Sequence, residues 1–281
     1  MRVLVVGATG ALGRQVVPRL LERGHAVNAV TTRPEAVAHL RVIGADAFVG
    51  DILDAATLRD PARGCDAALH LATRIPKAGG ARDFALNDRI RREGTANLIA
   101  AAQEAGFRRY VQQSITFLYG DHGSDWIDED TPLAPASFAS STVDMEDQVR
   151  ASGLDWCILR GAAFYGPGTG REESWAESAR AGTLTVPGDG SAYTSLIHSV
   201  DIARAFVLAT ESAPSGTTFN VVDDEPVQYA TLYQHLAVIY GGPAPKVGGS
   251  AGMASQRCTN RRLRAALGWE PVFPSFRSGL A

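Results

Sequence analysis

The stretch Val3-Leu4-Val5-Val6-Gly7-Ala8-Thr9-Gly10-Ala11-Leu12-Gly13 decides the fold of this 281-residue chain. Four consecutive apolar residues predict a buried strand, and the three glycines predict a tight turn that leads into a helix. Glycine at these positions lets the chain turn sharply, lets a pyrophosphate approach the backbone, and lets the helix pack on the strand. Unpaired N–H groups at the start of that helix attract phosphate. The predicted dinucleotide-binding residues are Gly7, Thr9, Gly10, Ala11, Leu12, Gly13 and Arg14.

Apolar segments alternate with helical patterns through the first two-thirds of the chain, which is typical of a parallel sheet covered by helices on both faces. Helices are expected over Ala11 to Arg23, ended by Gly24, over Asn87 to Ala105 and over Ser140 to Ala151. The predicted fold is α/β, a doubly wound parallel sheet of the Rossmann type. Its strands are expected near Val3 to Val6, Ala26 to Val30, Ala47 to Val49, Ala67 to Leu71, Arg109 to Gln113, Trp156 to Leu159 and Phe219 to Val222.

The regular alternation is interrupted after Gly166-Pro167-Gly168, where segments rich in glycine and proline begin. The pattern predicts a dinucleotide-binding Rossmann domain over residues 1–170, completed by about 198–222. A smaller C-terminal lobe for the substrate is predicted over residues 171–197 and 223–281.

Composition excludes several classes of protein. A hydrophobic fraction of 45% and a net charge of -3 indicate a globular chain with no affinity for nucleic acid, and no leader or membrane-spanning segment is expected. Cys65, Cys157 and Cys258 lack CxxC spacing and are predicted to be free thiols in the cytoplasm. The histidines show no metal-ligand spacing, so no metal is expected. The expected partner is a small molecule, and the oligomeric state stays open.

The end of the second predicted strand indicates which cofactor is bound. An acidic residue there would accept hydrogen bonds from the ribose hydroxyls of NAD, but this chain has Thr32 and Arg33. A guanidinium can bind a 2'-phosphate bidentately, and Arg14 would add a second positive charge. NADP(H) is therefore the predicted cofactor. The alternative is that Arg33 is a solvated surface residue.

Short motifs along nearly the whole chain carry a resemblance to a known family. They are Gly50-Asp51-Ile52, Leu69-His70-Leu71-Ala72, Gly94-Thr95-Ala96-Asn97, Leu118-Tyr119-Gly120, Tyr165-Gly166-Pro167-Gly168, Ile197-His198-Ser199-Val200-Asp201 and Leu267-Gly268-Trp269-Glu270-Pro271. With them the chain resembles the extended short-chain dehydrogenase/reductase family. The resemblance implies that Asp51 and Ile52 border the adenine and that Ala72 and Thr73 line the path toward the nicotinamide. Further cofactor contacts are expected at Leu71, Gly161, Ala162 and Ala163.

The catalytic residues of that family are absent at the matching positions. The family uses an asparagine, a serine or threonine, a tyrosine and a lysine, and these positions fall on Arg91, Ile115, Phe138 and Thr142. Tyrosine donates the proton in carbonyl reduction, and lysine lowers its pKa and holds the ribose. Phenylalanine has no proton to donate. No catalytic side chain is therefore assigned, and the two lysines of the chain, Lys77 and Lys246, lie outside the expected catalytic segments.

The expected substrate is a flat, apolar molecule. Where relatives that act on nucleotide sugars have an asparagine and an arginine, this chain has Ala163 and Thr194, which argues against such a substrate. The hydroxyls of Ser114 and Thr116 can orient a carbonyl. The predicted substrate-binding residues are Ser114, Ile115, Thr116, Phe138, Phe164 and Tyr165.

These features predict an NADPH-dependent ketoreductase of secondary metabolism that acts on an aromatic, polyketide-type ketone. The proton would come from water or from a phenol of the substrate, and positioning of the two reactants would supply much of the catalysis. Atypical angucyclinone ketoreductases of actinobacterial antibiotic pathways are similar. Two alternatives stay open: a catalytically silent NADP(H) sensor, and an isomerase or cyclase that needs no nicotinamide.

Overall fold

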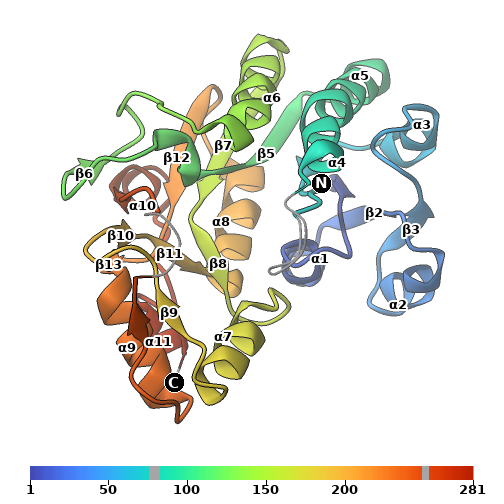
Figure 1. Ribbon diagram of the computed structural model, residues 1–281. Coiled ribbons are helices and arrows are strands. Elements are labelled where there is room, and N and C mark those ends of the chain that lie inside the picture. The colour runs from blue at the N-terminus through green and yellow to red at the C-terminus, as the bar shows by residue number, and fades with distance from the viewer. Residues whose placement is uncertain (76–82, 249–252, 281) are drawn as a thin grey trace. The chain divides into compact units, whose positions relative to one another are not determined.

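The computed structural model describes residues 1–75, 83–248 and 253–280 and contains a seven-stranded sheet in the order β12-β7-β5-β4-β1-β2-β3 (Figure 1). The register is parallel from β3 through β2, β1 and β4 to β5. Each strand expected from the sequence is present, so the α/β doubly wound fold is confirmed. The strands are β1 Arg2–Val6, β2 Ala26–Thr31, β3 Asp46–Val49, β4 Ala67–His70, β5 Arg109–Ile115, β7 Asp155–Gly161 and β12 Thr217–Val221.

The chain divides into two compact units. Unit 1 contains Met1–Ser114, Ala136–Leu159 and Ala203–Thr218, and unit 2 contains Ile115–Pro135, Arg160–Ile202 and Phe219–Ala281. This division differs from the limits expected from the sequence, because residues 115–135 and 160–170 are grouped with unit 2. The predicted domain limits therefore stay a proposal about which parts of the chain bind cofactor and substrate.

Unit 1 holds most of the sheet and the helices on its two faces. In Figure 1, α3, α5 and α6 lie on one face, and α1 and α2 lie on the other. The last helix of the unit, α8, begins in unit 2. The helices of unit 1 are α1 Gly13–Glu22, η1 Pro34–Ala36, α2 Val37–Val42, α3 Ala56–Ala62, α4 Ala85–Arg89, η2 Ile90–Gly94, α5 Thr95–Ala105, η4 Ser137–Ala139, α6 Ser140–Ala151 and α8 Ser199–Ser212.

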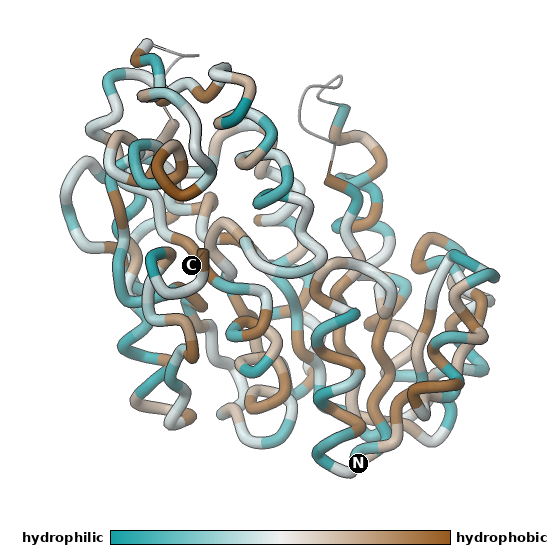
Figure 2. Tube along the Cα trace, turned by 90° about the horizontal axis from the view of Figure 1, so that it is seen from below, coloured by the Kyte–Doolittle hydropathy of each residue, from teal (hydrophilic) through white to brown (hydrophobic). Residues whose placement is uncertain are grey.

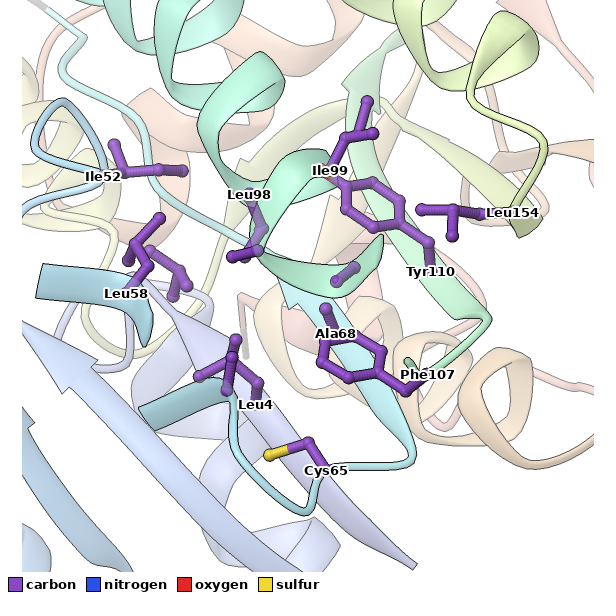
Figure 3. Close-up of a cluster of buried hydrophobic side chains, with 14 of the residues drawn as sticks. Leu4, Ile52, Leu58, Cys65, Ala68, Leu98, Ile99, Phe107, Tyr110 and Leu154 are labelled. Carbon is purple, nitrogen blue, oxygen red and sulfur yellow. The ribbon is translucent and has the colours of Figure 1, made fainter. Parts of the chain in front are cut away.

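The core of unit 1 forms between the sheet and one layer of helices (Figure 3). Leu4 and Ala68 from the strands meet Leu58 of α3 and Leu98 of α5, and all four side chains are fully buried. Burial of one leucine side chain stabilises the fold by roughly 1.5–3 kcal/mol. This packing fixes the end of each strand and with it the positions of the loops that follow.

The three helix predictions have different outcomes. Helix α6 has the predicted limits, and α1 is shorter by a few residues and is followed by Gly24 in the left-handed conformation, with φ at 80°. The long helix expected from Asn87 to Ala105 is interrupted, because Ile90–Gly94 forms a π-helical segment. A π segment has hydrogen bonds between residues five apart, so its turn holds one more residue than an α-helical turn, and such segments are frequent at functional sites.

Unit 2 is built from short strand pairs and surrounding helices. The pairs are β8 with β11, β9 with β14, β10 with β13, and β6 with β15. Figure 2 shows brown and teal segments along the turns of several helices of the molecule, which is the pattern of helices with one buried face. The elements of unit 2 are η3 Thr116–Tyr119, β6 Trp126–Ile127, β8 Ala163–Tyr165, α7 Arg171–Arg180, β9 Thr185–Val186, β10 Tyr193–Thr194, β11 Leu196–His198, β13 Val227–Gln228, α9 Tyr229–Ile239, β14 Lys246–Val247, β15 Arg257–Cys258, α10 Arg261–Leu267 and α11 Phe276–Gly279.

The described ranges contain no helix that is long and apolar enough to cross a membrane. Within the same ranges no cluster of three or more His, Cys, Asp or Glu side chains is arranged to hold a metal ion. The three cysteines are buried and free. Lys246 is exposed in β14, and Lys77 lies outside the described residues.

Candidate functional site

The turn between β1 and α1 requires glycine at two positions. Gly7 has a φ of 93°, and a Cβ atom there would lie 2.6 Å from the backbone nitrogen of Ala72. A Cβ atom on Gly13 would lie 2.2 Å from the carbonyl oxygen of Gly7. Any side chain at either position would push α1 or the segment after β4 away from the end of β1. The close approach expected of a dinucleotide-binding turn is therefore present.

The same turn offers free donors at the start of α1. Arg14 N–H donates to the Gly10 carbonyl, whereas the N–H groups of Ala11 and Leu12 make no backbone hydrogen bond with a described residue. The helix has no acidic residue in its first turn and no side-chain cap. A helix start with unpaired N–H groups and a positive dipole end suits a pyrophosphate, so the residues present fit a dinucleotide.

A pocket of about 480 Å³ lies beside this turn, within unit 1, and two arginines border it. The Nε of Arg14 donates to the Thr9 carbonyl at 3.0 Å, which holds its guanidinium at the pocket. Thr31 fixes the other side, since its Oγ1 lies 2.9 Å from Thr9 Oγ1 and accepts from the Arg33 N–H at 3.1 Å. The lining residues are Ala8, Thr9, Arg14, Val17, Pro18, Arg33, Ala36, His39, Leu40 and Ile43.

The remaining cofactor residues expected in unit 1 lie at the ends of three strands. Asp51 is exposed and its Oδ1 accepts from the Leu53 N–H at 2.9 Å, whereas Ile52 is buried. Leu71 is buried and donates through its N–H to the Val6 carbonyl, which brings the segment after β4 against the turn. The exposed members of this set are Thr32, Asp51 and Thr73, and Ala72 is half-buried.

Several predicted site residues belong to unit 2 and have packing contacts there. Gly161, Ala162 and Ala163 are buried, and a Cβ atom on Gly161 would lie 2.5 Å from the ring of Phe164. Tyr165 is fully buried, and its hydroxyl donates to the Ser275 carbonyl at 3.2 Å. Phe164 is half-buried. Tyr165 therefore packs inside unit 2 with its hydroxyl already used.

Ile115 and Thr116 also belong to unit 2. Ile115 is half-buried, and Thr116 is buried with a hydrogen bond between its hydroxyl and the thiol of Cys258. Burial raises the pKa of that thiol to about 12, so it stays protonated at neutral pH. The Thr116 hydroxyl is therefore engaged by the protein.

On the unit 1 side, Phe138 presents an aromatic surface. Its side chain is 45% exposed, and its ring centroid lies 6.0 Å from that of Phe84. Ser114 differs, since it is buried and its hydroxyl donates to Glu146 Oε1 at 2.6 Å. Glu146 is fully buried and also pairs with Arg150 at 2.5 Å. Of the predicted substrate residues in unit 1, Phe138 is therefore open for contact and Ser114 is engaged.

The positions expected for a catalytic asparagine and lysine hold a buried cation and a buried hydroxyl. Arg91 is 7% exposed, and its Nη1 donates to the Ser141 hydroxyl at 3.3 Å. Thr142 is buried, and its hydroxyl has no partner among the described residues. Burial lowers the pKa of nearby His70 to about 4, with a further contribution from the Arg91 charge, so His70 is neutral at pH 7.

Sequence reasoning missed three residues of these surroundings. His39 borders the pocket beside the two arginines, and Phe84 pairs with Phe138. Glu146 accepts the hydrogen bond from the Ser114 hydroxyl. Each depends on contacts between elements distant in sequence, and no local motif marks them.

The sequence of the chain matches a known protein family and several known proteins. Residues 3–222 match the family model described as the NAD dependent epimerase/dehydratase family. The chain is 38% identical to a 3-diazoavenalumate denitrifying reductase of a Streptomyces species, over 100% of this chain and 99% of that protein. It is 26% identical to a 4-hydroxy-2-methyl-3-oxo-4-farnesyl-3,4-dihydroquinoline-1-oxide ketoreductase of Stigmatella aurantiaca, over 86% of this chain and 74% of that protein.

Among solved structures, the chain is similar to the dTDP-glucose 4,6-dehydratase DesIV from Streptomyces venezuelae with NAD and TYD bound. The TM-score is 0.87 at 27% identity, and the match covers 100% of this chain and 95% of that one. The UDP-glucose 4-epimerase of Thermus thermophilus in complex with NAD has the same fold, with a TM-score of 0.84 at 24% identity over 100% and 96% of the chains. The glycine turn, the sheet order and a family match over residues 3–222 lead to one conclusion: the chain belongs to the NAD-dependent epimerase/dehydratase family, the extended short-chain dehydrogenases/reductases.

Proposed function

We propose that this chain is an NADPH-dependent reductase that transfers hydride to an aromatic acceptor without a side-chain acid. The observation that carries the proposal is the residue at the expected proton-donor position, Phe138, which is 45% exposed and has no proton to donate. The hydroxyl of Ser114, in the same unit, is bonded to Glu146. The dinucleotide supplies the hydride when bound. The proton therefore comes from water or from the acceptor itself, or the reaction needs none.

The phosphorylated cofactor is favoured by the pocket beside the turn. Arg14 and Arg33 border it from two elements, and no carboxylate is among its lining residues. A guanidinium binds a phosphate monoester through charge-assisted hydrogen bonds, each worth about 1.5–3 kcal/mol. The 2'-phosphate of NADP(H) supplies such a group, whereas the free hydroxyl of NAD(H) does not.

The first candidate acceptor is an aryl diazo compound. The specific observation is the 38% identity, over the whole chain, to a reductase whose name describes denitrification of a diazo compound. An aryl diazonium group takes hydride at the ring carbon and leaves as dinitrogen, so the balanced reaction forms the arene and the oxidised dinucleotide without a proton. This chemistry requires no tyrosine. It explains why an exposed phenylalanine at position 138 is compatible with an active enzyme.

The second candidate is the aromatic polyketide-type ketone predicted from the sequence. A phenol beside the carbonyl supplies the proton that the alkoxide needs after hydride transfer. The 26% identical ketoreductase of Stigmatella aurantiaca, whose name describes a quinoline-1-oxide substrate, supports this acceptor. Both candidates are flat and suit contact with the exposed ring of Phe138. Both also suit a cytoplasmic enzyme of secondary metabolism.

A panel of acceptors separates the candidates. The purified chain is incubated with NADPH that carries deuterium at C4, and with an aryl diazonium salt, a phenol-flanked ketone or the methyl ether of that ketone. Denitrification places deuterium on the arene carbon and releases dinitrogen, whereas ketone reduction places it on the carbinol carbon and fails with the methyl ether. Cofactor binding without turnover of any acceptor would support the silent sensor instead.

The cofactor part is tested by Arg33→Ala, with Arg63→Ala as the matched control. Arg63 is a surface arginine of the same unit and is distant from the pocket lining. Loss of a charge-assisted hydrogen bond to the 2'-phosphate should weaken NADPH binding by about tenfold or more. NADH binding should be unchanged in both variants. Equal weakening of NADPH and NADH in Arg33→Ala contradicts the preference for NADP(H).

A further inference from the structure

Arg91 is a buried cation whose charge the fold leaves without a carboxylate. It lies in the π segment η2, between α4 and α5, and is 7% exposed. Arginines on either side of it are paired: Arg89 with Glu93 at 2.9 Å and Arg92 with Asp144 at 2.6 Å. Arg91 forms no ion pair within 4.0 Å with any residue in the described ranges. Of these three arginines, Arg89 and Arg92 have a carboxylate partner among the described residues and Arg91 does not.

The hydrogen bonding of Arg91 is also incomplete. Its Nη1 donates to Ser141 Oγ at 3.3 Å, and this hydroxyl in turn donates to Asp88 Oδ1 at 2.6 Å. The Asp88 carboxylate is therefore linked to Arg91 through the Ser141 hydroxyl, without a direct ion pair between the two side chains. A guanidinium has five N–H donors, and within the described part of the chain this is the one hydrogen bond that Arg91 makes.

Such an arrangement is costly without a ligand. Burial lowers the pKa of Arg91, and the Asp88 charge offsets part of that effect, yet a guanidinium keeps its proton at neutral pH. Buried charges in proteins are normally paired or fully hydrogen-bonded, because removing an ion from water costs several kcal/mol. The geometry therefore lacks one anionic group beside Arg91.

The surroundings indicate which ligand supplies it. Arg91 lies close enough to His70, the last residue of β4, to influence its pKa, and the next residues, Leu71 and Ala72, contact the glycine turn at Gly7. Open α/β sheets bind ligands outside the carboxyl ends of their strands. The two phosphate-bearing parts of the dinucleotide already have their own sites, at the start of α1 and at the arginine pocket. Arg91 is therefore available to bind the other reactant, the hydride acceptor.

We propose that Arg91 binds an anionic oxygen of the acceptor, either a carboxylate or a phenolate. This inference rests on the proposed function and adds a substrate class to it: the aromatic acceptor carries an anionic group apart from its reacting centre and from any phenol that supplies the proton. A planar guanidinium matches a carboxylate bidentately and accepts a phenolate through one or two N–H groups. Contact with Arg91 would orient the ring on the unit 1 side, where Phe138 exposes its aromatic face.

The test uses simple probes on the NADPH-loaded protein, followed by ligand-observed NMR or calorimetry. The affinity for benzoate is compared with that for benzamide to test for a carboxylate ligand. The affinity for pentafluorophenol, which is ionised at neutral pH, is compared with that for pentafluoroanisole to test for a phenolate ligand. The wild-type chain should bind one anion about tenfold or more tightly than its neutral partner, since 1.4 kcal/mol of charge-assisted bonding corresponds to a factor of ten. Arg91→Gln should abolish that preference, and Arg91→Lys should keep part of it.

The matched control is Arg92→Gln, which removes a neighbouring arginine that already has a carboxylate partner. It should leave the preference for the anion unchanged. NADPH binding should stay within about twofold in all variants, since its phosphates have other partners. A wild-type chain that does not discriminate either anion from its neutral partner, or an Arg91→Gln variant that still does, overturns the proposal.

Stability gives a second, independent readout. Because Arg91 forms no direct ion pair with a carboxylate of the described residues, Arg91→Met should not lower the melting temperature of the ligand-free protein, whereas removing one partner of a satisfied buried pair typically costs about 3–5 kcal/mol. A large loss of stability in Arg91→Met would mean that the cation is satisfied internally, and it would refute the inference. Absence of hydride transfer to every acceptor is a different result and would instead refute the proposed function.

Discussion

Replacement of Gly13 by alanine tests whether packing of α1 against the turn creates the cofactor site. The added Cβ would lie 2.2 Å from the Gly7 carbonyl oxygen and 2.6 Å from two backbone atoms of Ala8. Ordinary contact begins at 3.4 Å, so the start of α1 must retreat by 3.4 minus 2.2, or about 1.2 Å. Backbone atoms cannot rotate away as a flexible side chain does. The free N–H groups of Ala11 and Leu12 therefore move with the helix.

A displacement of this size breaks a hydrogen bond of ordinary length to a phosphate. Each charge-assisted bond is worth about 1.5–3 kcal/mol, so the Kd for NADPH should rise by roughly tenfold to 150-fold. Overpacking costs about 1–3 kcal/mol of folding free energy, which corresponds to roughly 2–12 °C in melting temperature for a chain of this size. Calorimetric titration with NADPH and thermal unfolding by circular dichroism measure the two effects.

Gly10→Ala is the matched comparison. A Cβ atom on Gly10 would have one close neighbour, the Gly7 carbonyl oxygen at 3.3 Å, so the loss of stability should be smaller than for Gly13→Ala. If the second glycine admits the pyrophosphate, Gly10→Ala should still weaken NADPH binding. A Gly13→Ala variant with the NADPH affinity and melting temperature of the wild type would refute the reasoning about α1.

Three further predictions concern pH and the proposed chemistry. Burial raises the pKa of Glu211, but hydrogen bonds from Arg23 and His25 lower it more. The contribution of ionised Glu211 to folding stability is therefore complete above the unfolded-state pKa near 4.3 and is lost as the pH falls. Glu211→Gln should lower the melting temperature by more at pH 7 than at pH 3. Burial, with contributions from nearby carboxylates, raises the pKa of Asp223 far above its usual range, so the contribution of Asp223 to wild-type stability falls as the pH rises above about 3.9. The melting temperature of Asp223→Asn should therefore increase relative to that of the wild type between pH 4 and pH 8. A difference between the two that stays constant with pH contradicts this assignment. Phe138→Tyr should accelerate turnover of a ketone and leave turnover of a diazonium salt unchanged, as followed by NADPH consumption; acceleration of both would argue against proton-free denitrification.

The local sequence was sufficient for the sheet and for the cofactor turn. Strand β1 is a short apolar run, and the turn at Gly7 depends on a backbone conformation that glycine adopts without strain. Helix α6 was also predicted with its observed limits, Ser140 to Ala151. Such features depend on neighbours within a few residues, so they can be read from the chain itself.

The surroundings of the predicted acceptor site could be anticipated in part. The sequence identified Phe138 as a residue without a proton, but its 45% exposure and its pairing with Phe84 depend on how η4 packs. Ser114 was expected to orient a carbonyl, yet its hydroxyl is bonded to Glu146, thirty-two residues later in the chain. A hydroxyl has the same sequence signature whether it is free or engaged, so sequence reasoning did not distinguish the two.

By itself the sequence determined the α/β class, the order of strands and helices along the chain, and the absence of a tyrosine at position 138. Tertiary structure decided the rest, and Arg91 is the clearest case. In the sequence it is one of three arginines in a helical run; in the fold, a π segment and the approach of α6 bury it beside Ser141 without a directly paired carboxylate. Charge and propensity are properties of single residues, whereas burial and pairing are set by segments that meet only when the chain is folded.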